Sequence, residues 1–255
     1  MDSYADTAEF YDIAGRSYWK PRAATLTKAL SGAAGGPIVD IGAGTGLVVE
    51  LLGAALPAAE FIAVEPSAAM RAALIGRLLN RPELAARVTV VPETIEAVAL
   101  PERLGGAVAC GVLGYLDPER RRELWRMLAR RLAPGARAVV EAIPFPPTRV
   151  VRPIRVGAAR FGERTHEIWL GSEPAATPGR IELTTLCRVR AGDRVLRECV
   201  SRQEWFAVDM NTIVTETAAA GLCSRRTGWD LAALWPEGAA RLDARTSSAA
   251  ESINR

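Results

Sequence analysis

Short apolar runs alternate with longer amphipathic stretches over residues 36–145. Runs at 38–41, 60–64, 87–91, 106–110 and 137–143 are apolar or β-branched over most of their length, as buried parallel strands typically are. Between two of these runs, Met70, Leu74 and Leu78 recur at helical spacing, which predicts a helix with one buried face. The alternation predicts an α/β fold in which helices cover a parallel sheet.

The pattern changes after Pro144. Ile181, Leu183 and Thr185 alternate with the polar Glu182 and Thr184, which is typical of an antiparallel strand with one wet face. Over residues 163–206 the sequence predicts three such strands, at 165–170, 180–190 and 194–205, with a turn at 191–193. A last helix at 210–220 and a strand at 222–229 follow.

These patterns divide the chain into five segments. We expect an N-terminal helical cover at 1–35, an α/β core at 36–145, an antiparallel β insertion that forms a flap at 146–207, the last helix and strands of the core at 208–240, and a loose tail at 241–255. The first segment is rich in aromatic residues and is interrupted at Lys20-Pro21. It is consistent either with a helix that only packs on the sheet or with one that closes over a ligand.

Composition restricts the class of protein. The 32 basic and 29 acidic residues leave a net charge of +3, which gives no reason to expect a nucleic acid or an anionic membrane as partner. We find no apolar run of membrane-spanning length and no signal peptide, so we expect a soluble cytoplasmic protein. The four cysteines form no Cys-x-x-Cys pair, and neither a metal site nor a disulfide framework is predicted.

A glycine-rich turn follows the first predicted strand. Asp40 lies inside that strand, and Gly42, Gly44 and Gly46 come directly after it. Glycine accepts positive φ and lets a ligand lie against bare backbone. No Gly-Lys-Ser/Thr follows, which disfavours a phosphate-binding loop. Asp40 would repel a pyrophosphate and attract a cationic amino group, while Glu65, at the end of the second strand, is placed to bind ribose hydroxyls.

Three segments together carry a family resemblance. Val39-Asp-Ile-Gly-Ala-Gly-Thr-Gly46, Val64-Glu-Pro-Ser67 and Arg130-Arg-Leu-Ala-Pro-Gly-Ala-Arg-Ala-Val-Val140 resemble class I S-adenosylmethionine-dependent methyltransferases of the small-molecule type. The resemblance implies a Rossmann-like, seven-stranded, mostly parallel sheet with an antiparallel β insertion between strands five and six. It also implies S-adenosylmethionine as the cofactor.

The layout is loosely similar to the amino-sugar N,N-dimethyltransferases of natural-product pathways. Tyr11-Asp12 stands near the start, Glu141 ends the fifth strand, and a β insertion comes next. Tyr115 stands where that subfamily tends to place histidine. Because of this departure, the acceptor is predicted only to be a small molecule.

The resemblance assigns a set of residues to the cofactor. Within this set Glu93 would accept the adenine amino group, although an ordinary solvated glutamate fits the pattern too. Met70 fits a core position better than a cofactor contact. The cofactor residues are Tyr11, Asp40, Gly42, Ala43, Gly44, Gly46, Glu65, Pro66, Met70, Glu93, Thr94, Cys110 and Gly111.

Methyl transfer from a sulfonium is an in-line displacement, so the protein mainly aligns the acceptor and excludes water. An amine or hydroxyl acceptor must also lose a proton. The candidate catalytic residues are Tyr115, Glu141 and His166, the single histidine. Glu141 could instead form a structural salt bridge, and His166 could be a bystander on the inserted sheet.

The function predicted from the sequence is therefore S-adenosylmethionine-dependent methyl transfer, class 2.1.1, to nitrogen or oxygen of a small molecule in natural-product biosynthesis. One alternative is an enzyme of the same fold that catalyses elimination, cyclisation or rearrangement, with or without a partner chain. Another is a protein- or RNA-directed methyltransferase, or a non-catalytic binding subunit. A homodimer and a partner protein both remain open.

Overall fold

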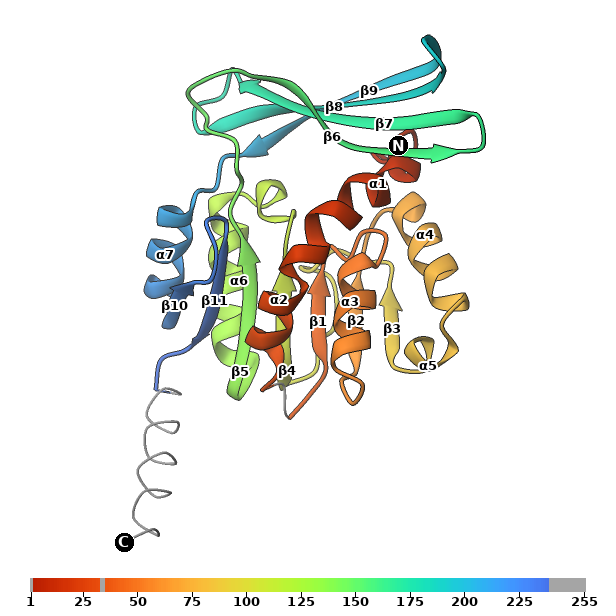
Figure 1. Cartoon of the computed structure of the whole chain (residues 1–255). Coiled ribbons are helices and arrows are strands. Elements are labelled where there is room, and N and C mark those ends of the chain that lie inside the picture. Colours follow the sequence, from red (N-terminus) through yellow and green to blue (C-terminus); the bar gives the residue numbers. More distant parts are fainter. Residues whose placement is uncertain (1, 33–34, 239–255) are drawn as a thin grey trace, which may run out of the picture.

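The computed structural model describes residues 2–32 and 35–238, and its main sheet has seven strands (Figure 1). The strands lie in the order β10-β11-β5-β4-β1-β2-β3, and β11 is antiparallel to both of its neighbours. The predicted seven-stranded, mostly parallel sheet is confirmed. The strands are β1 (Ile38–Ile41), β2 (Phe61–Val64), β3 (Val88–Val91), β4 (Leu104–Ala109), β5 (Leu132–Glu141), β10 (Leu222–Arg226) and β11 (Leu231–Pro236). The tail predicted at 241–255 lies outside the described residues.

Helices cover both faces of this sheet and enclose two hydrophobic cores. Successive strand residues point to opposite faces: Val139 packs in one core and Val140 in the other. Each strand is therefore apolar on both sides, which explains the continuous apolar runs of the sequence. On one face lie α2 (Ala23–Leu30), α3 (Leu47–Ala55), α4 (Ala68–Leu79) and α5 (Pro82–Ala85), and on the other lie α6 (Pro118–Arg131) and α7 (Met210–Ala219).

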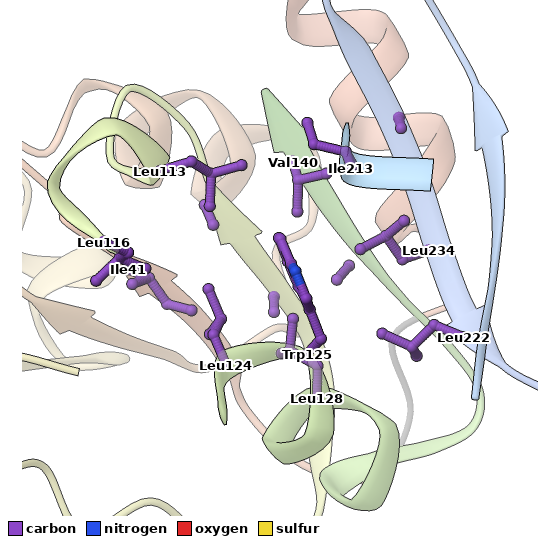
Figure 2. Packing of buried hydrophobic residues seen from close by; sticks show 14 of the residues in the cluster. Ile41, Leu113, Leu116, Leu124, Trp125, Leu128, Val140, Ile213, Leu222 and Leu234 are labelled. Atoms are coloured by element: carbon purple, nitrogen blue, oxygen red, sulfur yellow. The ribbon is translucent and has the colours of Figure 1, made fainter. Parts of the chain in front are cut away.

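Trp125 lies at the centre of the second core (Figure 2). Its side chain is fully buried between the sheet and helices α6 and α7, and its Nε1 donates to Glu216 on α7 at 2.9 Å. Arg121, one turn earlier on α6, is also buried and forms an ion pair with Glu216 at 2.7 Å. Arg121 and Trp125 thereby join α6 to α7 through Glu216.

The inserted segment forms a second, antiparallel sheet of four strands in the order β6-β7-β8-β9. The antiparallel insertion is confirmed, but three strands were predicted. The additional strand, β6, occupies an edge and pairs only with β7, where the missing N–H of Pro153 is tolerated. The strands are β6 (Val151–Phe161), β7 (Arg164–Pro174), β8 (Arg180–Ala191) and β9 (Arg194–Phe206); we call this sheet the flap.

Helix α1 (Ala8–Trp19) connects the flap to the core (Figure 1). It packs against β6 and β7 on one side and against α3 and α4 on the other. Phe10 is fully buried in a cluster with Ile168, Cys187 and Val189 of the flap. A short 3-10 turn, η1 (Lys20–Arg22), contains Pro21, and α2 follows it. The N-terminal segment thus holds the flap at a defined position over the sheet.

Several strand boundaries differ from the sequence-based expectation. Strand β5 begins at Leu132 rather than at residue 137, because Leu132 pairs with Leu104 of β4 before the register shifts. The strand expected at 222–229 ends at Arg226, and β11 returns beside it after a turn. None of the helices in the described part of the chain is long and apolar enough to cross a membrane.

Candidate functional site

A cavity of about 1510 Å³ lies where β1, β2, β4 and β5 end at their carboxyl termini. Parallel α/β sheets bind ligands at this edge. Residues between 2 and 19 and side chains of the flap close the other sides of the cavity. Its volume exceeds the roughly 300–1,000 Å³ of an ordinary small-molecule pocket. It therefore has room for two ligands side by side.

The turn after β1 presents its backbone to this cavity. Gly42, Gly44 and Gly46 all have positive φ, between 56° and 77°. A Cβ on Gly44 would meet no atom within 4 Å, so the turn leaves open space for a ligand there. A Cβ on Gly46 would lie 2.9 Å from Cγ of Leu74. Gly46 therefore permits close packing of the turn on α4 and does not line the cavity.

Asp40 is a buried carboxylate at the end of β1. Its side chain is 4 % exposed, and its Oδ2 has no hydrogen-bond partner among the described residues. Burial raises the pKa of Asp40 to about 7, and the nearby Glu65 adds to this shift. An unpaired buried carboxylate is costly. An amino group bound beside it would remove this cost, so Asp40 fits the cationic amino group of an amino-acid-like ligand.

The raised pKa of Asp40 predicts a pH-dependent effect on stability. Because its folded-state pKa lies above its unfolded value, its contribution to stability is present below the unfolded pKa and is lost as pH rises through about 7. We expect Asp40→Asn to raise the free energy of unfolding of the ligand-free protein by about 1–3 kcal/mol near pH 8. Urea unfolding should show this gain shrinking towards pH 4. An equal gain at both pH values would contradict the prediction, and the exposed Asp193→Asn is the control.

Glu65 connects the two turns on which the cavity rests. Its Oε2 accepts from the Gly44 N–H at 2.8 Å, and its Oε1 accepts from the Ser67 N–H at 2.7 Å. Burial raises the pKa of Glu65, and these two bonds oppose the shift. Each carboxylate oxygen has more than one lone pair, so both can still accept hydroxyl groups of a ligand. The predicted position of a ribose-binding carboxylate is therefore compatible with the geometry.

Glu141 ends β5 and also lines the cavity. It is 6 % exposed, and burial raises its pKa to about 7. The Tyr18 hydroxyl donates to Glu141 and lies 2.7 Å from Asp230. Asp230 is paired with Arg22 at 2.9 Å, whereas no cation forms an ion pair with Glu141 within the described ranges. The structure therefore does not show the structural salt bridge that was the alternative role for Glu141.

Tyr115 lies in a 3-10 turn, η2 (Leu113–Tyr115), just after β4. Its hydroxyl donates to Oε1 of Gln203 at 2.6 Å and contacts the Tyr4 hydroxyl, while its ring packs edge-on against Trp205. Burial raises the pKa of Tyr115. The phenol therefore keeps its proton at neutral pH and can orient an acceptor by hydrogen bonding, but it is a poor base.

The structure brings most of the predicted residues together and leaves three outside. Eleven of the thirteen cofactor residues line the cavity together with Tyr115 and Glu141; Gly46, Glu93 and His166 do not. Glu93 is exposed, and its neighbour Thr94 faces the cavity instead. His166 packs between the rings of Phe10 and Phe161, at 5.6 and 5.2 Å, so its neighbours are flap and α1 aromatics rather than reacting groups.

Sequence reasoning missed several residues of the site. Asp2 accepts from the Ser67 hydroxyl and from the Ala69 N–H, and it thereby holds the N-terminus at the start of α4. Tyr4 and Tyr18 reach into the cavity from the N-terminal segment. The aromatic cluster of this segment was the available signal. No sequence motif connects this aromatic cluster to Asp230, which accepts from Tyr18 and lies more than 200 residues later in the chain. The described residues contain no cluster that could hold a metal ion.

Comparison with known proteins agrees with this geometry. Residues 39–138 match the family model of a methyltransferase domain. DesVI from Streptomyces venezuelae superposes with a TM-score of 0.71 at 19% identity, over 91% of this chain and 98% of that one. CalS10 from Micromonospora echinaspora, an amino pentose methyltransferase solved with S-adenosylmethionine bound, superposes with a TM-score of 0.66 at 20% identity, over 85% and 90%.

KedS8 from Streptoalloteichus, a sugar N-methyltransferase, is similar as well, with a TM-score of 0.66 and 17% identity over 86% of this chain and 87% of that one. No curated protein matches the chain by sequence. At these identities the neighbours show the fold. The expected resemblance to class I methyltransferases is confirmed by the domain match over residues 39–138 and by the shared fold.

Proposed function

We propose that this chain, a methyltransferase of the class I fold, transfers a methyl group from S-adenosylmethionine to nitrogen or oxygen of a small molecule in the biosynthesis of a natural product. The single observation that carries the proposal is the pairing of Asp40 and Glu65 in one cavity. One buried carboxylate has an oxygen with no hydrogen-bond partner among the described residues, which suits an amino group, and a second carboxylate lies at the next strand end, which suits a ribose. The natural-product setting is supported by a neighbour assigned to calicheamicin biosynthesis.

The residues present fit the cofactor. The Gly42–Gly44 backbone and Asp40 would hold its amino-acid end, Glu65 its ribose, and Thr94 and Ile95 the adenine side of the cavity. When bound, the cofactor would supply a methyl group that is activated for transfer by the adjacent sulfonium.

The chain's own residues have the remaining tasks. Tyr115 and the flap orient the acceptor, and residues 2–19 exclude water from the cavity. A neutral acceptor lone pair is needed for attack. The proton that an acceptor loses passes to Glu141, whose pKa of about 7 suits it to take a proton near neutral pH, and from there to solvent.

The binding of the cofactor tests this proposal without any acceptor. Charge-assisted hydrogen bonds contribute roughly 1.5–3 kcal/mol each, and Glu65→Ala also removes the acceptor for the Gly44 and Ser67 amides. We expect Glu65→Ala to weaken binding of S-adenosylmethionine by about tenfold or more. Titration calorimetry measures the effect.

Glu93→Ala is the matched control, because Glu93 is exposed and lies outside the cavity. It should leave the affinity nearly unchanged. Equal affinities of wild type and Glu65→Ala would remove Glu65 from the cofactor site. If the wild-type protein did not bind S-adenosylmethionine at all, the proposed function would be wrong.

A further inference from the structure

The cavity is lined by an excess of acidic side chains. Among the described residues that line it are seven carboxylates and one cationic side chain, that of Arg120. Two of the acids are engaged elsewhere: Asp12 pairs with Arg77, and Asp2 caps α4. Asp40 and Glu141 are buried, and neither forms an ion pair with a described residue. The field inside the cavity therefore favours a cation.

The single lining cation is poorly placed to bind an anionic ligand. The Arg120 side chain is 57 % exposed and lies on α6, 3.9 Å from Glu96 and 3.7 Å from Asp117. Glu96 and the preceding Ile95 belong to the part of the cavity where the proposed adenine end lies. Arg120 is thus neutralised by its acidic neighbours.

The flap contributes a nearly uncharged wall to the cavity. Its lining side chains come from all four strands and occupy positions of one face. Five are apolar and one carries a hydroxyl: Val156, Ile168, Leu170, Leu183, Thr185 and Trp205. Most charged flap residues fall on alternate positions, as in the Arg188–Glu198 pair. Arg197 shares the face of the lining residues but pairs with Glu9 of α1, and no charged flap residue lines the cavity.

These features distinguish between two kinds of amine. A nucleotide-linked amino sugar carries a diphosphate, which proteins bind with arginine or lysine forks or with free helix amides. Placing such a dianion beside carboxylates in a partly buried cavity is unfavourable. An apolar body gains instead from burial against the flap, and its ammonium group gains from the Glu141 carboxylate and from the ring of Tyr115, since the ring of Tyr18 already carries Arg22 at 3.7 Å.

Resting on the proposed methyl transfer, we infer that the acceptor is an amine carried on an apolar body without a phosphate or other anionic group. The amine lies at Glu141, between Tyr18 and Tyr115, and the body lies against Leu170, Leu183 and Trp205. An ammonium acceptor gives one proton to the Glu141 carboxylate, and its freed lone pair forms the bond to the methyl carbon. The sulfur keeps the electron pair of the broken bond, and the proton leaves to solvent.

A panel of acceptors tests the inference with the full-length protein. Tryptamine, 2-phenylethylamine and dodecylamine represent amines on apolar bodies, and a nucleoside-diphosphate-linked amino sugar represents the anionic class. The matching alcohols of the three amines test the acceptor atom. We expect kcat/KM for at least one apolar amine to exceed that of the nucleotide-linked sugar and of its own alcohol by tenfold or more, with labelled S-adenosylmethionine as donor.

Two leucines of the same strand form a matched pair of variants. Leu183 lines the cavity from β8, whereas Leu186 lies at an alternate position of that strand and does not. We expect Leu183→Ala to raise KM for the apolar amine by about tenfold, from the loss of buried apolar surface. Leu186→Ala should leave KM unchanged, and calorimetry should show intact cofactor binding in both variants.

The outcomes separate the inference from the proposed function. Preferential methylation of the nucleotide-linked sugar or of an alcohol would overturn the inference and leave methyl transfer standing. Equal effects of Leu183→Ala and Leu186→Ala on KM would also overturn it. Absence of transfer to every acceptor, together with absence of cofactor binding, would overturn both.

Discussion

Glu141→Gln is expected to lower kcat for methyl transfer by a hundredfold or more. Glutamine keeps the shape of the side chain and can still accept a hydrogen bond from Tyr18, but it cannot take a proton or balance an ammonium group. Loss of a general base typically costs this much. The affinity for S-adenosylmethionine should change little, because Asp40 and Glu65, rather than Glu141, are placed to bind it.

The pH profile provides a second readout for the same variant. Burial raises the pKa of Glu141 to about 7, so the proton-accepting form increases as pH rises through about 7. The kcat of the wild-type protein should rise over this range, and the variant should lack that rise. Glu173→Gln, at an exposed flap position outside the cavity, is the control. Near-full turnover with an unchanged profile would exclude Glu141 as the base and leave alignment as the source of catalysis.

Trp125→Ala is expected to lower the free energy of unfolding by about 3–5 kcal/mol. The indole is fully buried between Ile213, Val140 and Leu234 in the core beneath α6 and α7 (Figure 2). Its loss leaves a cavity that the rigid sheet cannot close, and it removes the Nε1 donor to Glu216. Urea unfolding followed by circular dichroism measures the change.

Trp229 supplies the matched control, because the same residue type is 66 % exposed there. Trp229→Ala should change stability by no more than about 0.5 kcal/mol, as surface substitutions usually do. Similar losses in the free energy of unfolding for Trp125→Ala and Trp229→Ala would contradict the prediction, because burial of the side chain would then not determine the size of the effect. Trp125→Phe should recover part of the loss, since it restores an aromatic ring but not the hydrogen bond.

Local patterns were sufficient to predict the core. Strands apolar on both faces, the glycine turn after β1 and the buried face of α4 at Met70, Leu74 and Leu78 depend on neighbours in the sequence, and the structure has all of them. The positions of Asp40 and Glu65 followed in the same way, because a residue at the carboxyl end of a parallel strand lies at the ligand-binding edge whatever the rest of the chain does.

Edge pairing and side-chain direction were not predictable from these patterns. Strand β6 forms because it pairs with β7. Its own sequence shows no clear alternation of apolar and polar residues, and it contains a proline. His166 has the chemistry of a catalytic residue. Its strand position turns it towards Phe10 and Phe161, and the burial of Phe10 under the flap keeps it there.

The sequence by itself determined the fold class, the glycine turn after β1 and the two acids at the strand ends, because each can be recognised from residues that are close neighbours in the chain. Only the tertiary structure decided the acceptor side. Tyr18, Glu141 and Asp230 meet because the Tyr18 hydroxyl, near the end of α1, reaches the last residue of β5 and the residue before β11. The apolar wall exists because four antiparallel strands present alternate residues to one side. Both depend on packing between distant segments, which no local spacing encodes.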